Sequence, residues 1–588
     1  MNYNKVEQLY VDFILDLIGP NQDRENQRKI NLSIVKDIIT KTFDSKLPDF
    51  KTYIKAYGSY PIKTYLNNAD IDITIFFESK KEQKVLLELP IDVINKAIII
   101  IKEEFERYNK ESSFELFNDI RIIMADIRLL KCKIGSISLD ISINNFSGLF
   151  KIVFIDYIEK QFQSQFNKKN LFPDSPYANN KINIFRRSLL LIKGWCLLEG
   201  NLMGSSIGLM ASYTIEILVI YIFNFHYEYI YNEFDAFEKF FEFMENIDWE
   251  NNVITLFGIF SNQYFNTKLS SLNSKIQKDK KNNIDINEPF WYFKNIYNDK
   301  TQALSIKMNS FSTSSCEPFL KINELKKLIS PINKSIENIY LKQKVKIINE
   351  SIFEKSIKIL DPINNCNNLG KSINFHSYSK MRQVIIYLNK QLKSIHKIRK
   401  KGNPFLYLNS LLYLFKTTLS KNFIELFINS LSCPRILANS KIYNKYSLIN
   451  KKGIKIEKEY IKQFNNLFKE SKSSNDKDYF DDEEYDKYEE ENIGEGVSSS
   501  EKDIEENYEE DEYVDEEEDE KEVLDEDAKP NKEEKIKYIP LINNQIIKKI
   551  FELYENRQEV VKNNNQLIIE SMNYSNELGK FLKEHKLI

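Results

Sequence analysis

Two stretches of the chain alternate between apolar and polar residues, which is the pattern of a strand that buries one face. In residues 70–75, isoleucine fills every odd position, while Asp70 and Asp72 point to the opposite face, roughly 7 Å apart along the strand. Residues 136–144 alternate in the same way, and Asp140 lies on their polar face. Two such strands side by side would bring three carboxylates to one place, so we predict that they are neighbours in one sheet.

Helical spacing dominates the rest of the chain. Apolar residues recur every three or four positions in residues 5–18 and 30–43, which predicts two amphipathic helices before the strands. Residues 85–108 also have helical spacing, residues 120–145 have the pattern of two or three strands, and residues 150–260 are apolar and helical. The fold class that follows is α+β, with a mixed sheet first and a mostly helical region after it.

The same pattern divides the chain into parts. A lysine-rich run at residues 278–283 interrupts the helical region and indicates an inserted loop. Few aliphatic residues occur between 471 and 530, which predicts disorder there. The predicted parts are N-terminal helices packing on the helical lobe (1–48), a sheet-containing domain (49–150), a helical domain (151–400) with an inserted loop at about 263–324, a helical extension (401–470), an acidic disordered segment (471–535) and a helical tail (536–588).

Charge is distributed unevenly along the chain. The 588 residues have a formal net charge of −3, but residues 471–530 contain 29 acidic and six basic residues. The remainder holds 77 basic and 57 acidic residues, and a basic surface of this kind suits a polyanionic partner. General enrichment in lysine on solvated faces would give the same excess. The acidic segment is either a solubilising linker or a binding site for a basic partner.

No feature of the sequence predicts export or membrane insertion. The five cysteines are widely spaced without a Cys-x-x-Cys pair, and four histidines are too few for a zinc cluster, which is typical of a reducing compartment. The N-terminal residues lack an apolar signal core. The apolar run 207–225 contains Glu216, so we expect a buried helix rather than a membrane span. A nuclear or cytoplasmic protein is expected.

The three aspartates point to metal-dependent phosphoryl chemistry. Two carboxylates this close repel each other unless a cation lies between them, and a divalent cation is the usual partner. Asp70, Asp72 and Asp140 would then form a two-metal site for phosphoryl or nucleotidyl transfer. The polar faces of ordinary edge strands are the alternative interpretation. The pair Gly58-Ser59, about a dozen residues before Asp70, favours the transfer site because glycine lets a phosphate approach the backbone.

The sequence resembles the DNA polymerase β-like nucleotidyltransferases over about residues 5–395, apart from the insertion. The likeness is greatest to the eukaryotic terminal nucleotidyltransferases related to poly(A) and poly(U) polymerases, whose helical substrate-binding domain is of the PAP/OAS1 type. The resemblance rests on Gly58-Ser59, Lys63 to Leu66, Asp70-Ile71-Asp72, Leu129 to Cys132, Leu139 to Asn144, Arg187 to Cys196, Gly208 to Tyr213, Asp248 to Glu250, Asp361-Pro362 and Asn367 to Ser372. Together these motifs are specific; alone, only the stretch from Gly58 to Asp72 is.

The resemblance implies a role for each of these residues. Asp70 and Asp72 would bind both metal ions, Mg²⁺ or Mn²⁺, and Asp140 would bind one of them beside the primer 3′-hydroxyl. The remaining nucleotide-binding residues would be Gly58, Ser59, Lys193 and Ser212 on the phosphates, Asn144 on the ribose, Tyr213 stacked on the base, and Asp361, Asn368 and Gly370 in the loop that closes over it. Plain structural roles are the alternatives: a snorkelling lysine at Lys193, a core aromatic at Tyr213 and a strand-end cap at Asn144.

Three features depart from the family's pattern. Asn367 stands where uridylyl-adding relatives often have a histidine, which favours ATP over UTP. Leu197 stands one turn after Lys193, where many relatives have a second basic residue, so phosphate binding would rest on fewer charges. The Gly58-Ser59 pair also lacks the second glycine that many relatives place after it.

The expected function is template-independent addition of AMP or UMP to RNA 3′ ends, with ATP or UTP as the other substrate. The sequence contains no RNA-recognition module, so a basic surface or a protein partner would select the RNA. Two alternatives stay open. One is a relative that acts on another acceptor, such as a 2′-5′ oligonucleotide or a small molecule. The other is a catalytically silent RNA- or protein-binding scaffold, although all three carboxylates are present.

Overall fold

The structure is a computed structural model of the chain. It describes residues 3–67, 69–86, 89–112, 115–124, 128–168, 183–256, 258–263, 319–320, 355–363, 367–402, 404–419 and 557–585. All of these residues belong to one structural unit, made of residues 1–465 and 541–588. The predicted acidic segment, most of the predicted insertion and residues 420–470 of the predicted helical extension lie outside the described residues.

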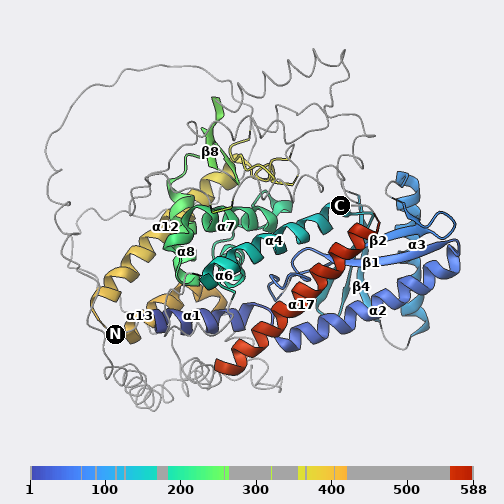
Figure 1. The fold of residues 1–588 in the computed structure, drawn as a ribbon, viewed down its shortest axis with the longest axis horizontal. Coiled ribbons are helices and arrows are strands. Elements are labelled where there is room, and N and C mark those ends of the chain that lie inside the picture. Colours follow the sequence, from blue (N-terminus) through green and yellow to red (C-terminus); the bar gives the residue numbers. More distant parts are fainter. Residues whose placement is uncertain are drawn as a thin grey trace, which may run out of the picture. The chain divides into compact units, whose positions relative to one another are not determined.

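A mixed sheet forms the centre of the N-terminal part of the chain (Figure 1). Its strands run in the order β1-β2-β6-β5-β4, and the short β3 pairs with β2. Strands β2 and β6 are parallel, whereas the other neighbours are antiparallel. The bounds are β1 Phe50–Tyr57, β2 Ile71–Ser79, β3 Lys84–Val85, β4 Phe117–Ile123, β5 Leu129–Ile134 and β6 Ile137–Ile143. The fold class is therefore confirmed, and the two alternating stretches are neighbouring strands.

Helices α2 (Gln22–Lys46) and α3 (Ile91–Glu111) pack on the apolar face of this sheet. The apolar side chains of β2 and β6 are buried there with those of both helices, and Ile73 and Ile141 are fully buried. This burial fixes the register of β2, because a shift by one residue would turn its aspartates into the core. The polar face of the sheet is thereby left for Asp72 and Asp140.

A helical region follows the sheet. Helix α4 begins three residues after β6, and α6, α7, α8, α12 and α13 pack against one another in the described part of the chain. The bounds are α4 Phe146–Lys168, α6 Ile184–Leu198, α7 Ser212–His226, α8 Glu233–Asn246, α12 Phe375–Lys400 and α13 Pro404–Leu412, with short 3₁₀ turns at Ser205–Ile207, Tyr227–Tyr229 and Tyr413–Phe415. Residues 214–224 of α7 are buried, as expected for the apolar run. Among the described helices, none combines the length and apolarity needed to cross a membrane.

Two expectations need correction. Helix α1 (Tyr3–Ile18) packs against α6, α8 and α13, but α2 packs against β1 and α3, so the N-terminal helices do not both belong to the helical lobe. The apolar positions of α2, such as Val35 and Phe43, complete the core beneath the sheet instead. The second correction is a hairpin of β7 (Asn252–Thr255) and β8 (Gly258–Ser261), where helix was expected. A short apolar run does not let periodicity separate helix from strand.

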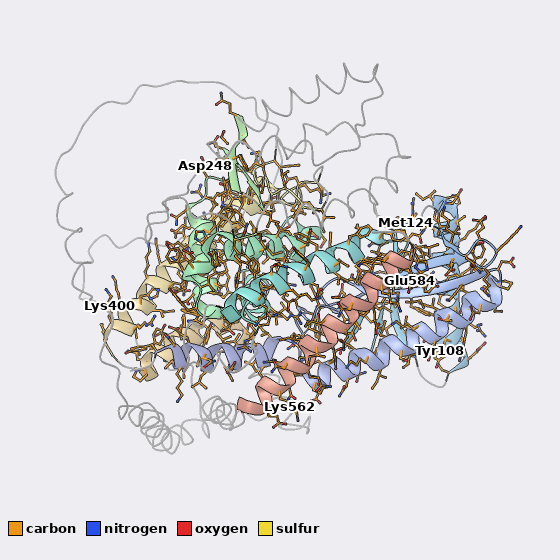
Figure 2. The ribbon with its side chains drawn as sticks, in the orientation of Figure 1. Tyr108, Met124, Asp248, Lys400, Lys562 and Glu584 are labelled. Carbon is orange, nitrogen blue, oxygen red and sulfur yellow. The ribbon has the colours of Figure 1, made fainter. Side chains whose placement is uncertain are left out.

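The last described helix, α17 (Arg557–Glu584), lies against α4 and beside β1 (Figure 1). In Figure 2, Lys562 and Glu584 lie near its two ends. Its buried side chains recur at helical spacing and include Leu567, Ser571, Leu578 and Phe581. The predicted helical tail thus contains a long amphipathic helix that packs on α4 and contacts β1.

Candidate active site

Three aspartates meet at one end of the two parallel strands. In the register of β2 and β6, Asp72 is the direct neighbour of Asp140, and Asp70 comes just before β2 begins. Neighbouring strands are about 4.8 Å apart, so the two carboxylates on the same face are necessarily close. The sequence prediction of two adjacent carboxylate-bearing strands therefore corresponds to the observed geometry.

A lysine of the third strand lies between two of these carboxylates. Lys131 of β5 is paired in register with Asp140. Its Nζ atom lies 3.0 Å from Asp70 Oδ2 and donates to Asp140 Oδ2 at 3.3 Å, while Asp140 Oδ1 is 3.1 Å away. The ammonium group thus offsets part of the negative charge. The alternation of residues 129–134, with Leu130 and Cys132 buried, could have identified Lys131 from the sequence.

The pKa values of Asp72 and Asp140 reflect the closeness of the carboxylates. Burial, together with the negative charges of Asp140 and Asp70, raises the pKa of Asp72 to about 7. Burial is also the main cause of the raised pKa of Asp140, which Lys131 opposes. A carboxyl group with a pKa near neutrality is poised to exchange a proton for another cation.

The donor set suits a divalent metal chemically. Magnesium and manganese prefer carboxylate oxygens, and Asp70, Asp72 and Asp140 lie at the same end of β2 and β6. In the described part of the chain, however, no three His, Cys, Asp or Glu side chains converge as a ready-made metal site. The ammonium group of Lys131 lies between Asp70 and Asp140 and contacts both carboxylates. A metal ion would therefore have to take over these carboxylate contacts from Lys131.

The Gly58-Ser59 turn lies directly against Asp72. Gly58 has φ +73°, and a Cβ atom there would lie 2.3 Å from Asp72 Oδ2, so only glycine fits. The turn continues through Ser59, whose carbonyl accepts from the Thr64 amide at 3.0 Å. The predicted phosphate-binding turn is thus adjacent to the predicted metal ligands.

Lys193 lies beside this loop, but it is not an isolated charge. Its Nζ atom donates to the Thr64 carbonyl and to Glu216 Oε1, both at 3.0 Å, and its side chain is buried. The Ser212 hydroxyl donates to the same carboxylate oxygen at 3.4 Å. Lys193 and Ser212 are therefore brought together through Glu216, which we did not predict. A lone glutamate in an apolar helix was the available signal, because a buried carboxylate requires a partner.

Tyr213 connects this group to the predicted base-recognition loop. Its hydroxyl donates to Asp361 Oδ1 at 3.2 Å, and the Asn367 amide donates to Asp361 Oδ2 at 3.1 Å. Burial raises the pKa of Tyr213 well above its usual value, so the hydroxyl remains a donor. The ammonium group of Lys151 in α4 lies 4.1 Å from the centroid of the Tyr213 ring. No sequence pattern singled out Lys151.

Two families match the sequence of this chain. The model of the central palm domain of mitochondrial-like poly(A) RNA polymerase matches residues 11–160, which contain the sheet and all three aspartates. The model of the PAP/OAS1 substrate-binding domain matches residues 179–335, which contain Lys193, Ser212 and Tyr213.

These two matches relate the chain to the nucleotidyltransferases of the poly(A) RNA polymerase type. Enzymes of this type depend on divalent metal ions. No curated protein sequence matches this nucleotidyltransferase significantly.

Solved structures of Cid1 are among those similar to this chain. One structure describes the structural plasticity of Cid1 and its RNA terminal uridylyl transferase activity. It is 12% identical to this chain, with a TM-score of 0.37, and the match covers 66% of this chain and 93% of that chain. Cid1 with the UTP analogue UMPNPP is 12% identical, with a TM-score of 0.36 over 67% and 95%. Cid1 with its short product ApU is 12% identical, with a TM-score of 0.36 over 66% and 93%. The relation to the nucleotidyltransferases rests on the two family models and not on these structures.

Three predicted nucleotide-binding residues of this nucleotidyltransferase take part in contacts within their own loops. Asn368 accepts from the amides of Ile359 and Gly370 and is fully buried. A Cβ atom at Gly370 would lie 2.4 Å from the Ile357 carbonyl. The Asn144 amide donates to the Leu86 carbonyl at 2.8 Å, and Asn144 has φ +54° at the end of β6. These contacts hold Asn368 and Gly370 within their loop, whereas the buried Asn144 Oδ1 has no hydrogen-bond partner in the described part of the chain.

A cavity of about 110 Å³ lies elsewhere in the described part of the chain. Asp12, Arg186, Asn563 and Leu567 are among its lining residues. None of the predicted site residues lines it. We therefore place the candidate active site at the carboxylates, Lys193 and Tyr213 rather than at this cavity.

Proposed function

We propose that this nucleotidyltransferase is a template-independent RNA terminal nucleotidyltransferase. It would transfer a nucleoside monophosphate from a nucleoside triphosphate to the 3′-hydroxyl of RNA. The observation that carries the proposal is the side-by-side position of Asp72 and Asp140, with Gly58 against Asp72. Carboxylates under a glycine turn suit a triphosphate held by cations, and the basic composition outside residues 471–530 suits an RNA partner.

The roles of the carboxylates follow from their positions. Asp70, Asp72 and Asp140 would hold Mg²⁺ or Mn²⁺, which neutralises the phosphates and stabilises the attacking and leaving oxygens. The RNA 3′-oxygen forms a bond to the α-phosphorus, the bond from that phosphorus to the β-phosphate oxygen breaks, and pyrophosphate leaves. Asp140 lies beside the 3′-hydroxyl and accepts its proton, which suits a carboxyl group whose pKa is raised by burial.

The nucleotide is bound by the remaining groups. Backbone amides at Gly58 and Ser59 hold the β- and γ-phosphates, and Ser212 and Lys193 add a hydroxyl and a positive charge. Because Lys193 forms an ion pair with Glu216, less of its positive charge is available to a phosphate than an unpaired lysine would offer. Tyr213 stacks on the base, and Asp361 orients the Tyr213 ring through its hydroxyl. Asn367 stands where uridylyl-adding relatives often have a histidine, so we expect ATP rather than UTP; its side-chain amide donates to Asp361.

Extension of a short labelled RNA by the purified chain tests the proposal. Each of the four nucleoside triphosphates would be supplied separately with Mg²⁺ or Mn²⁺, beside the double variant Asp70→Ala/Asp72→Ala. A ladder with ATP that the variant lacks is the expected result. A ladder with UTP alone would keep the reaction and reject the assignment of Asn367.

Two other results would reject the proposal. Products from free nucleotides but not from RNA would indicate a different acceptor, such as a 2′-5′ oligonucleotide. RNA binding without extension by any nucleotide, across several RNAs and both metals, would favour a catalytically silent scaffold.

A further inference from the structure

Helix α17 contacts the strand that leads into the phosphate-binding turn. Strand β1 is an edge strand of the sheet, so its outer backbone groups have no strand partner among the described residues. The Tyr574 hydroxyl donates to the carbonyl of Ala56 at 2.6 Å, two residues before Gly58. Burial raises the pKa of Tyr574, so this hydroxyl is a donor at any physiological pH. The backbone on the N-terminal side of the turn is thus held by α17.

The other end of the same turn is held as well. Lys63 follows the turn with φ +55°, a left-handed conformation that a lysine rarely adopts. Its ammonium group forms an ion pair with Glu25 of α2, and Glu570 of α17 lies 4.0 Å away. Glu570 also pairs with Lys29 of α2 at 2.9 Å. Glu570 therefore contributes to the acidic surroundings that keep Lys63 in place.

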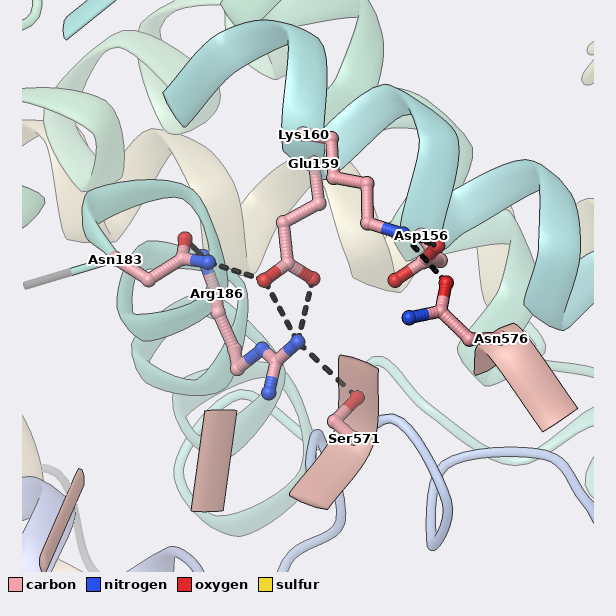
Figure 3. Close-up of polar contacts among 7 residues, drawn as sticks. All are labelled: Asp156, Glu159, Lys160, Asn183, Arg186, Ser571 and Asn576. Atoms are coloured by element: carbon pink, nitrogen blue, oxygen red, sulfur yellow. Dashed lines mark hydrogen bonds and ion pairs between the residues drawn. The ribbon is translucent and has the colours of Figure 1, made fainter. Parts of the chain in front are cut away.

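Contacts on the neighbouring helices fix α17 itself. Figure 3 shows Arg186 Nη2 between the two carboxylate oxygens of Glu159, at 2.6 and 2.7 Å, and the hydroxyl of Ser571, at 3.3 Å. Lys160 of α4 donates to Asn576 at 3.5 Å on the exposed side. Near the C-terminal end, the ring of Phe581 contacts the ring of Tyr53, with 5.2 Å between the centroids. Residues of α4, α6 and β1 thus define where α17 lies.

We propose that α17 positions the Gly58-Ser59 turn for nucleotide binding, with Tyr574 and Glu570 as the positioning residues. This inference rests on the proposed function. The turn is joined at one end to Ala56 and at the other to Lys63, and α17 reaches both ends. Gly58 lies so close to Asp72 that a shift of the turn would also disturb the predicted metal ligands. Neither positioning residue touches the nucleotide; both act through the backbone of the turn.

Two variants and one control test the inference in the full chain. Tyr574→Phe removes the hydroxyl and keeps the ring, and Glu570→Gln removes one charge and keeps the shape. Asn576→Ala changes a residue of the same helix that accepts a hydrogen bond from Lys160 of α4, outside the turn. The readouts are KM for the nucleoside triphosphate, kcat for RNA extension, and direct binding of a non-hydrolysable triphosphate analogue. Melting temperature is measured for every variant.

We expect KM and the dissociation constant of the analogue to rise about fivefold in Tyr574→Phe, as for the loss of one hydrogen bond. Glu570→Gln should change both in the same direction, and kcat should fall as well in both variants, because a shift of the turn also disturbs Asp72. Asn576→Ala should leave all three values unchanged. A lowered melting temperature with unchanged KM and binding in both variants would overturn the inference and leave α17 as a purely structural helix.

The failure of this inference differs from the failure of the proposed function. If the wild-type chain binds the analogue and extends RNA but neither variant weakens binding, only the positioning role is rejected. If the wild-type chain neither binds the analogue nor extends RNA, the proposed function is rejected, and the positioning role with it.

Discussion

Asp72 of β2 and Asp140 of β6 are direct neighbours in the register of two parallel strands. Each also shares its surroundings with Asp70, so three negative charges gather at one end of the sheet. This arrangement is unfavourable for a protein without a bound cation. It therefore has measurable effects on stability that do not depend on catalysis.

The first prediction concerns the dependence of stability on pH. The pKa of Asp72 is about 7 in the folded chain and lies near 4 when the residue is unfolded and exposed. The folded state therefore binds more protons between pH 4 and pH 7, and stability conferred by Asp72 decreases as pH rises through this range. Asp72→Asn cannot titrate. Relative to the wild-type chain, the variant should gain stability between pH 4 and pH 7, and the gain should level off above pH 7.

Thermal unfolding in the presence of a chelator, at half-unit steps of pH, measures this difference. A matched control is Asp119→Asn, because Asp119 is an exposed carboxylate that forms an ion pair with Lys133. A constant difference between Asp72→Asn and the wild-type chain over the whole range would contradict the prediction.

The second prediction concerns Lys131. Lys131→Met removes the cation between Asp70 and Asp140 but keeps most of the apolar stem. We expect the metal-free chain to lose about 1 kcal/mol of unfolding free energy at pH 8, since the groups are only partly buried. Added Mn²⁺ should restore more stability in the variant than in the wild-type chain. Manganese titrations followed by thermal unfolding would measure this, and equal stabilisation of both proteins would argue against competition between Lys131 and a metal ion.

Much of the sheet could be predicted because a strand period of two is unambiguous when isoleucine fills every second position. The alternation at Ile71, Ile73 and Ile75 identified the buried face and, by exclusion, the face of Asp72. The register then placed Asp72 beside Asp140. The same signal was present for Lys131, where Leu130 and Cys132 are buried on either side.

Contacts between distant parts of the chain could not be predicted in this way. Tyr574 and Ala56 are 518 positions apart, and no local pattern encodes which strand an amphipathic helix will cover. The pairing of Lys193 with Glu216 was missed because the two residues lie in different helices and periodicity does not assign partners between helices. Asn368 was expected to face the nucleotide, yet its amide is used within its own loop. Side-chain direction in an irregular loop depends on backbone conformation, which composition does not specify.

The third prediction separates two properties of Tyr213. Its ring is proposed to stack on the base, and its hydroxyl donates to Asp361. Tyr213→Ala removes both, and base–aromatic stacking is worth roughly 1–3 kcal/mol, so KM should rise about 5- to 150-fold. Tyr213→Phe keeps the ring and should raise KM only about two- to tenfold. Steady-state extension of RNA measures both. Equal effects of the two variants would mean that the hydroxyl, rather than the ring, is what the nucleotide depends on.

The fourth prediction concerns the turn itself. Gly58→Ala introduces a Cβ atom at a position that lies 2.3 Å from Asp72 Oδ2, in a residue with φ +73°. The left-handed conformation alone costs an alanine roughly 1–2 kcal/mol, and the contact with Asp72 must also be relieved by moving the turn or the carboxylate. Either movement disturbs phosphate binding, so we expect the KM for the triphosphate to rise and kcat to fall by at least about tenfold.

Gly135→Ala is a matched control, because Gly135 has φ +58° but no atom lies within 4 Å of the place that an added methyl group would occupy. Gly135→Ala should lower the melting temperature through the same backbone strain, while KM and kcat stay at the wild-type values. Normal kinetics in Gly58→Ala as well would remove the turn from the nucleotide site.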